Sequence, residues 1–131
     1  MIGLDTNVLV RYIMQDDARQ SGKATAFVES LDDAGGGYVT LVSIVELVWV
    51  LGSSYELTRA QVAMALDGIL RTRQFTIERA DQVLRALRVF KVGKADFADC
   101  LIERSAASAG CDKTVTFDVS ASRYAGMTLI Q

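Results

Sequence analysis

The feature that most constrains this chain is the regular alternation of strand-like and helix-like segments along its 131 residues. Short apolar runs bounded by turn residues predict strands, and apolar residues three and four apart predict helices. Predicted strands cover residues 2–4, 38–40, 74–77, 114–117 and 127–130; predicted helices cover 7–14, 19–31, 42–51, 58–71, 78–90, 96–109 and 119–124. Strands separated by helices favour parallel pairing. We therefore predict an α/β fold with a central, mostly parallel sheet of four to five strands and helices on both faces.

The length and composition predict one domain over residues 1–131. Hydrophobic residues make up 50% of the chain and charged residues 23%, which is typical of a globular protein. No linker or internal repeat divides the sequence, and the glycine triplet at 35–37 is too short to separate domains. No apolar run approaches the roughly 20 residues that cross a bilayer. The start MIGLDTN has no basic leader, so we expect a cytoplasmic protein without a membrane segment.

The absence of histidine excludes several kinds of chemistry. Serine–histidine and cysteine–histidine nucleophiles require that residue, and so do most zinc sites. The two cysteines, Cys100 and Cys111, form no CxxC pair, and we expect both to be buried thiols. The net charge of −2 predicts no overall basic surface for nucleic acid, although a local basic rim can serve that purpose. Chemistry in this chain must therefore use carboxylates, lysine, hydroxyls or a bound ion.

Several carboxylates stand where the predicted strands end. Asp5 directly follows the first strand, and Asp118 directly follows the strand at 114–117. Ligands of an open parallel sheet bind beyond the carboxyl ends of its strands. Asp96 and Asp99 begin a helix that starts at this edge, and their spacing of three places them on one helical face. We expect these acids to face the same edge of the sheet.

Glu46 lies about one turn into the helix predicted at 42–51. It is the only charged residue between Asp33 and Glu56, and its helix has almost no polar face. A buried, unpaired carboxylate costs several kcal/mol or takes up a proton, so we expect a cation beside it. The alternative is a salt bridge to a remote arginine such as Arg11 or Arg123.

Each of the other acids also has a simpler explanation. Asp5, Asp96 and Asp118 can serve as helix N-caps, and Asp99 suits the positive end of a helix dipole. Glu103 continues the same helical face but lies a turn deeper, so we interpret it as a solvated surface acid. Four acids converging at one edge are not economically explained by capping, and an oxygen-preferring cation such as Mg²⁺ or Mn²⁺ would neutralise them.

Four segments of the chain resemble a known family. They are IGLDTNVLVRYI, SIVELVWVL, GKADFADCLI and TVTFDVSASRYAG, and together they extend from one end of the sequence to the other. They resemble the PIN-domain family, specifically the VapC-type toxins of bacterial toxin–antitoxin pairs. The resemblance implies a single PIN domain and an Mg²⁺- or Mn²⁺-dependent endoribonuclease that hydrolyses RNA phosphodiester bonds with metal-activated water, without a protein nucleophile.

The resemblance also implies roles for the acids. Asp5 in LDTN and Asp99 in DFADCL match the main metal ligands, and Glu46 in VEL and Asp118 in TFD match the residues that complete the acidic cluster. Asp96 matches a position that is acidic only in some subgroups, which leaves a cap as its alternative role.

Further positions match the polar and basic surroundings of that cluster. Asn7 and Thr116 match residues that would orient the acids. Arg11, Lys91 and Lys94 are candidate RNA contacts, with a solvated basic surface as the alternative for each. Many relatives carry a basic residue just after the TFD aspartate, whereas this chain continues with Val119 and Ser120.

The resemblance implies two kinds of protein partner, a VapB-like antitoxin and a second copy of the chain in a homodimer or higher oligomer. The apolar segment at 42–51, which includes Trp49, and the segment at 62–70 offer more apolar surface than one small sheet needs. Ordinary core packing competes with an interface as the explanation.

Three other classes are weaker matches. A response-regulator receiver domain requires an acidic pair after the first strand, where Asp5 stands alone, and a lysine after a late strand, where Lys113 precedes it. A haloacid-dehalogenase-type phosphatase requires an aspartate at the position of Asn7. The main alternative is a non-catalytic or regulatory binding module on a PIN scaffold, but such a module is expected to lose acids that this chain keeps.

Overall fold

The computed structural model describes all 131 residues as two compact units, Met1–Glu78 and Arg79–Gln131. We refer to them as the N-terminal and C-terminal units and describe each by itself. No helix in either unit has the length and apolar character needed to cross a membrane.

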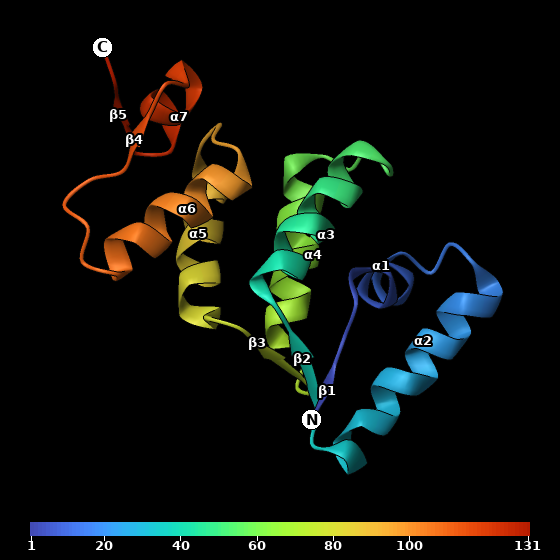
Figure 1. Cartoon of the computed structure of the whole chain (residues 1–131). Coiled ribbons are helices and arrows are strands. Elements are labelled where there is room, and N and C mark those ends of the chain that lie inside the picture. The colour runs from blue at the N-terminus through green and yellow to red at the C-terminus, as the bar shows by residue number, and fades with distance from the viewer. The chain divides into compact units, whose positions relative to one another are not determined.

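The N-terminal unit is built on a three-stranded parallel sheet (Figure 1). Its elements in chain order are β1 (Ile2–Gly3), α1 (Thr6–Met14), α2 (Ala18–Ser30), the 3₁₀ turn η1 (Leu31–Ala34), β2 (Gly37–Val39), α3 (Leu41–Ser53), α4 (Arg59–Arg71) and β3 (Phe75–Ile77). The strand order is β1-β2-β3, with Gly37 of β2 opposite both Ile2 and Phe75. Both crossovers consist of helices, as parallel pairing requires.

The glycine triplet creates the entry into β2. Gly35 and Gly36 have φ angles of 81° and 89°, which disfavour residues with a side chain. At Gly37, a Cβ atom would lie 2.8 Å from Cδ1 of Leu4 and 3.0 Å from Cδ1 of Leu31. The sequence break at 35–37 is therefore also the place where β2 passes close to the core.

Side-chain caps begin the helices of the N-terminal unit. The hydroxyl of Thr40 accepts from the backbone N–H of Ser43 at the start of α3. Thr58 and Gln61 form a reciprocal capping box at the start of α4. Helix α1 packs against α2 and α3, and α3 packs against α4. The fully buried core side chains include Leu9, Val28, Leu31, Val39, Ile44, Leu47, Leu51 and Leu66.

The C-terminal unit consists of two packed helices and a small sheet. Its elements are α5 (Ala80–Val92), α6 (Phe97–Ser108), β4 (Val115–Thr116), α7 (Val119–Tyr124) and β5 (Thr128–Leu129). Helix α5 packs against α6, where Phe90 and Phe97 meet edge to face with ring centroids 5.8 Å apart. Strands β4 and β5 pair in parallel, with Val115 opposite Thr128.

The structure confirms the α/β class and parallel strands, and each predicted strand and helix is present with shifted boundaries. The five strands form two sheets, of three and two strands, so the largest sheet is smaller than the four to five strands predicted. The hydrogen-bonded ladders explain the difference, because β4 pairs only with β5.

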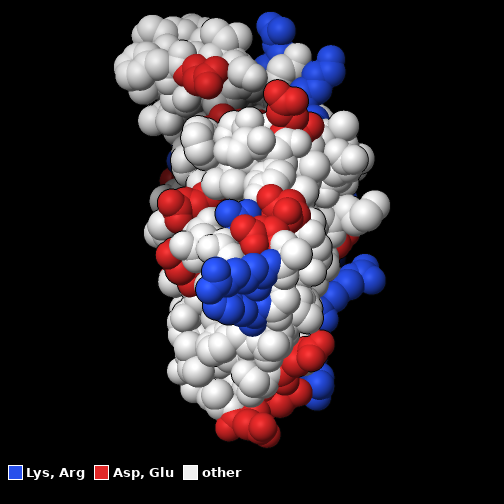
Figure 2. All heavy atoms as spheres, turned by 90° about the vertical axis from the view of Figure 1, so that its right-hand side faces the viewer, with Lys and Arg blue, Asp and Glu red and all other residues white.

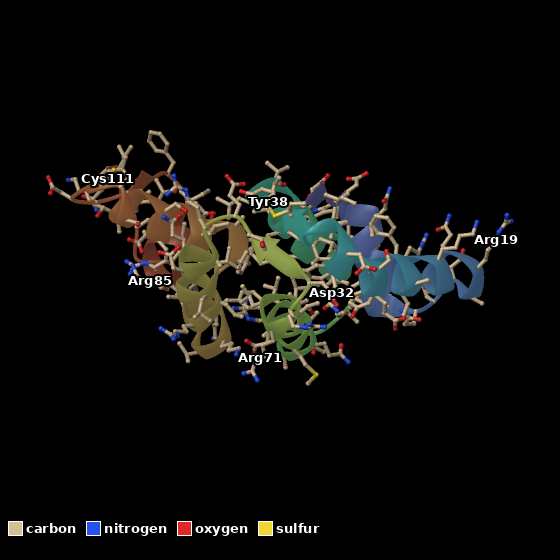
Figure 3. All side chains as sticks on the ribbon, turned by 90° about the horizontal axis from the view of Figure 1, so that it is seen from below. Arg19, Asp32, Tyr38, Arg71, Arg85 and Cys111 are labelled. Atoms are coloured by element: carbon tan, nitrogen blue, oxygen red, sulfur yellow. The ribbon has the colours of Figure 1, made fainter.

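The prediction for the cysteines is half right. Cys100 is buried on α6, but Cys111 is exposed (Figure 3). Gly110, with a φ of 94°, ends the turn after α6, and Cys111 follows in the loop before β4. An exposed loop position overrides the tendency of this residue type to be buried.

Candidate active site

Asp5 and Glu46 come together in the N-terminal unit through the residue that follows Asp5. Asp5 is the N-cap of α1, and its Oδ1 accepts a hydrogen bond of 2.8 Å from the backbone N–H of Thr6. The Thr6 hydroxyl donates to Oε1 of Glu46 on α3, at 2.6 Å. Both acids line one pocket of about 620 Å³. The end of β1 and the first turns of α3 therefore present two carboxylates to the same space.

Glu46 is exposed, so the argument from its burial is wrong. Helix α3 buries Ile44 and Leu47, but Val42 and Trp49, which lie one turn from Glu46 on either side, are 71% and 69% exposed. The sequence showed an apolar helix, and apolar composition alone does not indicate which face is covered.

Thr6 is a site residue that the sequence reasoning missed. It is buried, and its hydroxyl is the hydrogen-bond partner of Glu46 in this unit. The alternative of a salt bridge from Arg11 to Glu46 is not found, since Arg11 pairs with Asp16 instead. The only sequence signal for Thr6 is a hydroxyl directly after Asp5.

Asp96 and Asp118 are N-caps in the C-terminal unit. Oδ1 of Asp96 accepts from the backbone N–H groups of Ala98 and Asp99 at 2.8 and 3.4 Å. Oδ1 of Asp118 accepts from Ser120 and Ala121 at the same two distances. The cap role proposed for Asp96 is confirmed, and Asp118 and Asp5 also have this role. In all three aspartates Oδ2 takes no part in the cap.

Asp99 lies in the first turn of α6, where its carboxylate is electrostatically disfavoured. Partial burial raises its pKa, and the negative charges of Asp96 and Asp118 raise the pKa further. These three acids are therefore close enough to repel one another, with no cation paired to them. A bound divalent cation would relieve this repulsion, and carboxylate oxygens are the donors that Mg²⁺ and Mn²⁺ prefer.

The full predicted metal cluster is not contained within one unit. Asp5 and Glu46 belong to the N-terminal unit, and Asp96, Asp99 and Asp118 belong to the C-terminal unit. Neither unit by itself brings three such side chains into a group that could hold a metal ion.

The remaining predicted positions lie near these acids in sequence. Asn7 is exposed and lines the pocket that holds Asp5. The hydroxyl of Thr116 accepts from the backbone N–H of Asp118 at 3.0 Å, which helps to set the turn that carries this acid. Lys91 lies in the last turn of α5, and Lys94 lies in the loop before α6; both are exposed.

Glu103 is not the solvated acid that we predicted. Its side chain is only 14% exposed and forms an ion pair with Arg104. Glu103 is shielded from solvent because it lies on α6 beside the turn at Gly126. A Cβ atom added at Gly126 would lie 3.9 Å from the Glu103 carboxyl group.

The net charge of the chain is −2. On the face shown in Figure 2, basic and acidic side chains are interspersed, and no continuous basic surface is visible there.

A comparison with protein families assigns the chain to a class. The family described as PIN domain matches residues 2–127, so this chain belongs to the PIN-domain family. The matched range includes all five acids of the predicted metal cluster.

The chain is also similar to a named ribonuclease. Over 115 residues the chain is 26% identical to the VapC ribonuclease of Aquifex aeolicus (strain VF5), a match that covers 87% of this chain and 84% of that protein. The family expected from the sequence motifs is thereby confirmed.

Proposed function

We propose that this protein is an Mg²⁺- or Mn²⁺-dependent endoribonuclease and the toxin of a type II toxin–antitoxin pair. Membership of the PIN-domain family and the similarity to a VapC ribonuclease support the proposal. The observation that carries it is the pair of carboxylates, Asp5 and Glu46, which are linked through Thr6 and line one pocket. Carboxylate oxygens are the ligands that Mg²⁺ prefers. The raised pKa of Asp99 beside Asp96 and Asp118 is in keeping with the proposal.

The proposed metal ligands come from both units. Asp5 and Asp99 would be the main ligands, with Glu46 and Asp118 completing the set and Asp96 the weakest member. The family match over residues 2–127 includes all of these acids. Each capping aspartate keeps Oδ2 outside its cap, so capping and metal binding are compatible.

The chain's own residues prepare this chemistry by fixing carboxylates. Thr6 holds Glu46 through its hydroxyl, and the caps fix the rotamers of Asp5 and Asp118. Thr116 supports the turn that presents Asp118. A divalent cation, when bound, supplies activation of water and neutralisation of charge on the phosphate. Preorganised acids lower the cost of assembling such a site.

The test is cleavage of structured RNA by the purified protein with Mg²⁺ or Mn²⁺. Asp5→Asn and Asp99→Asn should each abolish cleavage. Matched controls are Asp33→Asn in the N-terminal unit and Asp112→Asn in the C-terminal unit, which remove a surface acid outside the site and should leave cleavage unchanged. Undiminished cleavage by both site variants would sink the metal mechanism. A wild-type protein that cleaves with neither metal would favour the non-catalytic binding module.

The proposed partners are a VapB-like antitoxin and a second copy of the chain. The exposed apolar side chains of Val42 and Trp49 on α3 support an interface on that helix. Expression of the chain alone should arrest growth, and co-expression with the product of an adjacent gene for a small DNA-binding protein should restore it. Light scattering should give at least a dimer mass that falls on Trp49→Glu. Growth unaffected by the wild-type chain would contradict the toxin role.

A further inference from the structure

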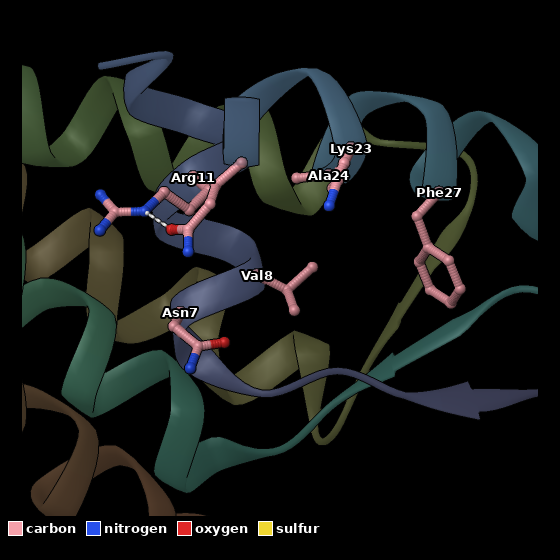
Figure 4. Close-up of a pocket in the computed structure, with 7 residues that line it drawn as sticks. Asn7, Val8, Arg11, Lys23, Ala24 and Phe27 are labelled. Atoms are coloured by element: carbon pink, nitrogen blue, oxygen red, sulfur yellow. Dashed lines mark hydrogen bonds between the residues drawn. The ribbon is translucent and has the colours of Figure 1, made fainter. Parts of the chain in front are cut away.

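Four polar side chains form a hydrogen-bonded network beside the pocket of Asp5 and Glu46. Arg11 on α1 donates from Nη1 to Asp16 at 3.2 Å and to the Tyr55 hydroxyl at 3.0 Å, and from Nε to Gln20 at 2.7 Å. The Tyr55 hydroxyl in turn donates to Oδ2 of Asp16 at 2.8 Å. The dashed line at Arg11 in Figure 4 marks its hydrogen bond from Nε. The network fixes Nε and Nη1 of the guanidinium and leaves Nη2 unused.

Stability does not explain this arrangement well. The side chains of Arg11 and Asp16 are 33% and 38% exposed. An exposed pair of this kind contributes little to stability, because solvent screens it and two long side chains lose freedom. Arg11 has three partners, Asp16, Gln20 and Tyr55, whereas an ion pair requires only one. The network is better suited to fixing the direction of the guanidinium.

The pocket next to this network is lined by both acidic and basic side chains. Its lining includes Asp5 and Glu46, the acids proposed to hold a metal, and also Arg11 and Tyr55. Its volume of about 620 Å³ is in the range of small-ligand sites. An RNA strand with its scissile phosphate at the acids would carry a neighbouring phosphate, and a guanidinium is the side chain best matched to that group.

Tyr55 remains a hydroxyl donor over the working range of pH. Its hydrogen bond to Asp16 raises the pKa of the phenol, and burial acts in the same direction. The bond from Tyr55 also lowers the pKa of Asp16, which therefore stays charged. The partners that orient Arg11 are thus in one protonation state near neutral pH.

We propose that Arg11 binds a phosphate of the RNA strand next to the scissile bond and that Tyr55 is the positioning residue that aims its guanidinium. The inference rests on the proposed function, since it takes RNA as the substrate and the acids as the cleavage site. It adds a binding subsite in the N-terminal unit and assigns a role to Tyr55 and Asp16.

The experiment measures binding of a fluorescently labelled RNA hairpin with a single-stranded loop, in protein that carries Asp99→Asn to prevent cleavage. Arg11→Gln should weaken binding about tenfold and reduce the slope of log affinity against log salt by about 0.7, the loss of one phosphate contact to a single strand. Tyr55→Phe should weaken binding about three- to tenfold, the loss of one hydrogen bond. In the Arg11→Gln background, Tyr55→Phe should have no further effect.

The control is Tyr12→Phe, which removes a phenol hydroxyl from α1 at a side chain whose contact is the ring of Phe75. It should leave RNA affinity unchanged. Melting temperatures of the variants distinguish a role in stability from a role in RNA binding. A variant that only loses stability keeps the RNA affinity of its folded fraction.

Several results would overturn the inference: no RNA binding by the reference protein, an unchanged salt slope in Arg11→Gln, or multiplying effects of the two substitutions. Binding with these losses but no metal-dependent cleavage by the wild type would refute the proposed function and, with it, the placement next to a scissile bond; the phosphate contact of Arg11 and the positioning role of Tyr55 would stand. Cleavage that depends on Asp5 and Asp99, with binding indifferent to Arg11, would do the reverse.

Discussion

Substitution of Asp118 by alanine and by asparagine separates its role as a cap from its proposed role as a metal ligand. Its Oδ1 accepts two backbone N–H groups at the start of α7. Alanine removes both bonds and the charge. Asparagine keeps an acceptor oxygen of similar capping strength and removes only the charge.

The size of the stability effect follows from the cap. Loss of an N-cap costs about 1 kcal/mol, and aspartate and asparagine differ little at this position. With an unfolding entropy of about 2.1 cal/mol/K per residue over 131 residues, that cost lowers Tm by about 4 °C. We therefore expect Asp118→Ala to melt about 4 °C below the wild type in EDTA and Asp118→Asn to melt within about 1 °C of it.

The activity of the same two proteins should not follow their stability. Both should lose Mn²⁺-dependent RNA cleavage, because both lose the carboxylate charge. The matched pair at Asp96, which caps α6 in the same way, should show the same pattern in Tm, but Asp96→Asn should keep most of its cleavage. Calorimetry and a gel assay measure the two quantities. Full cleavage by Asp118→Asn would refute the ligand role and leave Asp118 as a cap only.

Four further predictions concern stability and reactivity. The pKa of Asp99 is raised in the folded protein, so its contribution to stability is present below the ordinary pKa range of a carboxyl and is lost as pH rises through the raised pKa. Asp99→Asn should therefore melt above the wild type in EDTA at neutral pH. A difference in Tm that persists in acid would contradict this sign. Saturating Mn²⁺ should raise the Tm of the wild type but not of Asp99→Asn. Gly36→Ala should destabilise the protein by about 1–2 kcal/mol in chemical denaturation, since the φ of Gly36 is 89° and a Cβ would lie 3.0 Å from the Gln74 carbonyl oxygen. Gly68→Ala in α4 should instead stabilise the protein by about 0.5–1 kcal/mol. Equal effects of the two substitutions would refute the conformational argument. A thiol reagent should modify Cys111 rapidly in the native protein and Cys100 only on unfolding, so rapid reaction of two thiols would contradict the burial of Cys100.

The elements of the fold were predictable because they depend on local patterns. The helix that begins after Thr58 was predicted from apolar residues at helical spacing, and the structure shows that a capping box begins it. The break at 35–37 was found from the glycines alone, whose positive φ angles are a backbone property. The grouping of strands was not predictable, because short strands carry no signal of which neighbour they pair with.

The site shows the same division between local and tertiary information. The candidate acids and their possible caps could be named from sequence, since an aspartate after a strand and before a helix has few roles. The exposure of Glu46 could not, because the apolar helix α3 buries one face and leaves Val42 and Trp49 on the other. The tie from Thr6 to Glu46 joins residues 40 positions apart, and no local pattern indicates it.

The sequence by itself determined that this chain is an α/β protein of the PIN-domain family whose chemistry is based on carboxylates, because periodicity, motif order and the absence of histidine are all properties of the linear chain. The tertiary structure decided which partners those residues have. In the folded chain Thr6 hydrogen-bonds to Glu46, and Asp16 and Tyr55 contact Arg11. The pKa of Asp99 is raised. Hydrogen bonds, burial and electrostatic repulsion depend on distances that only the folded chain sets.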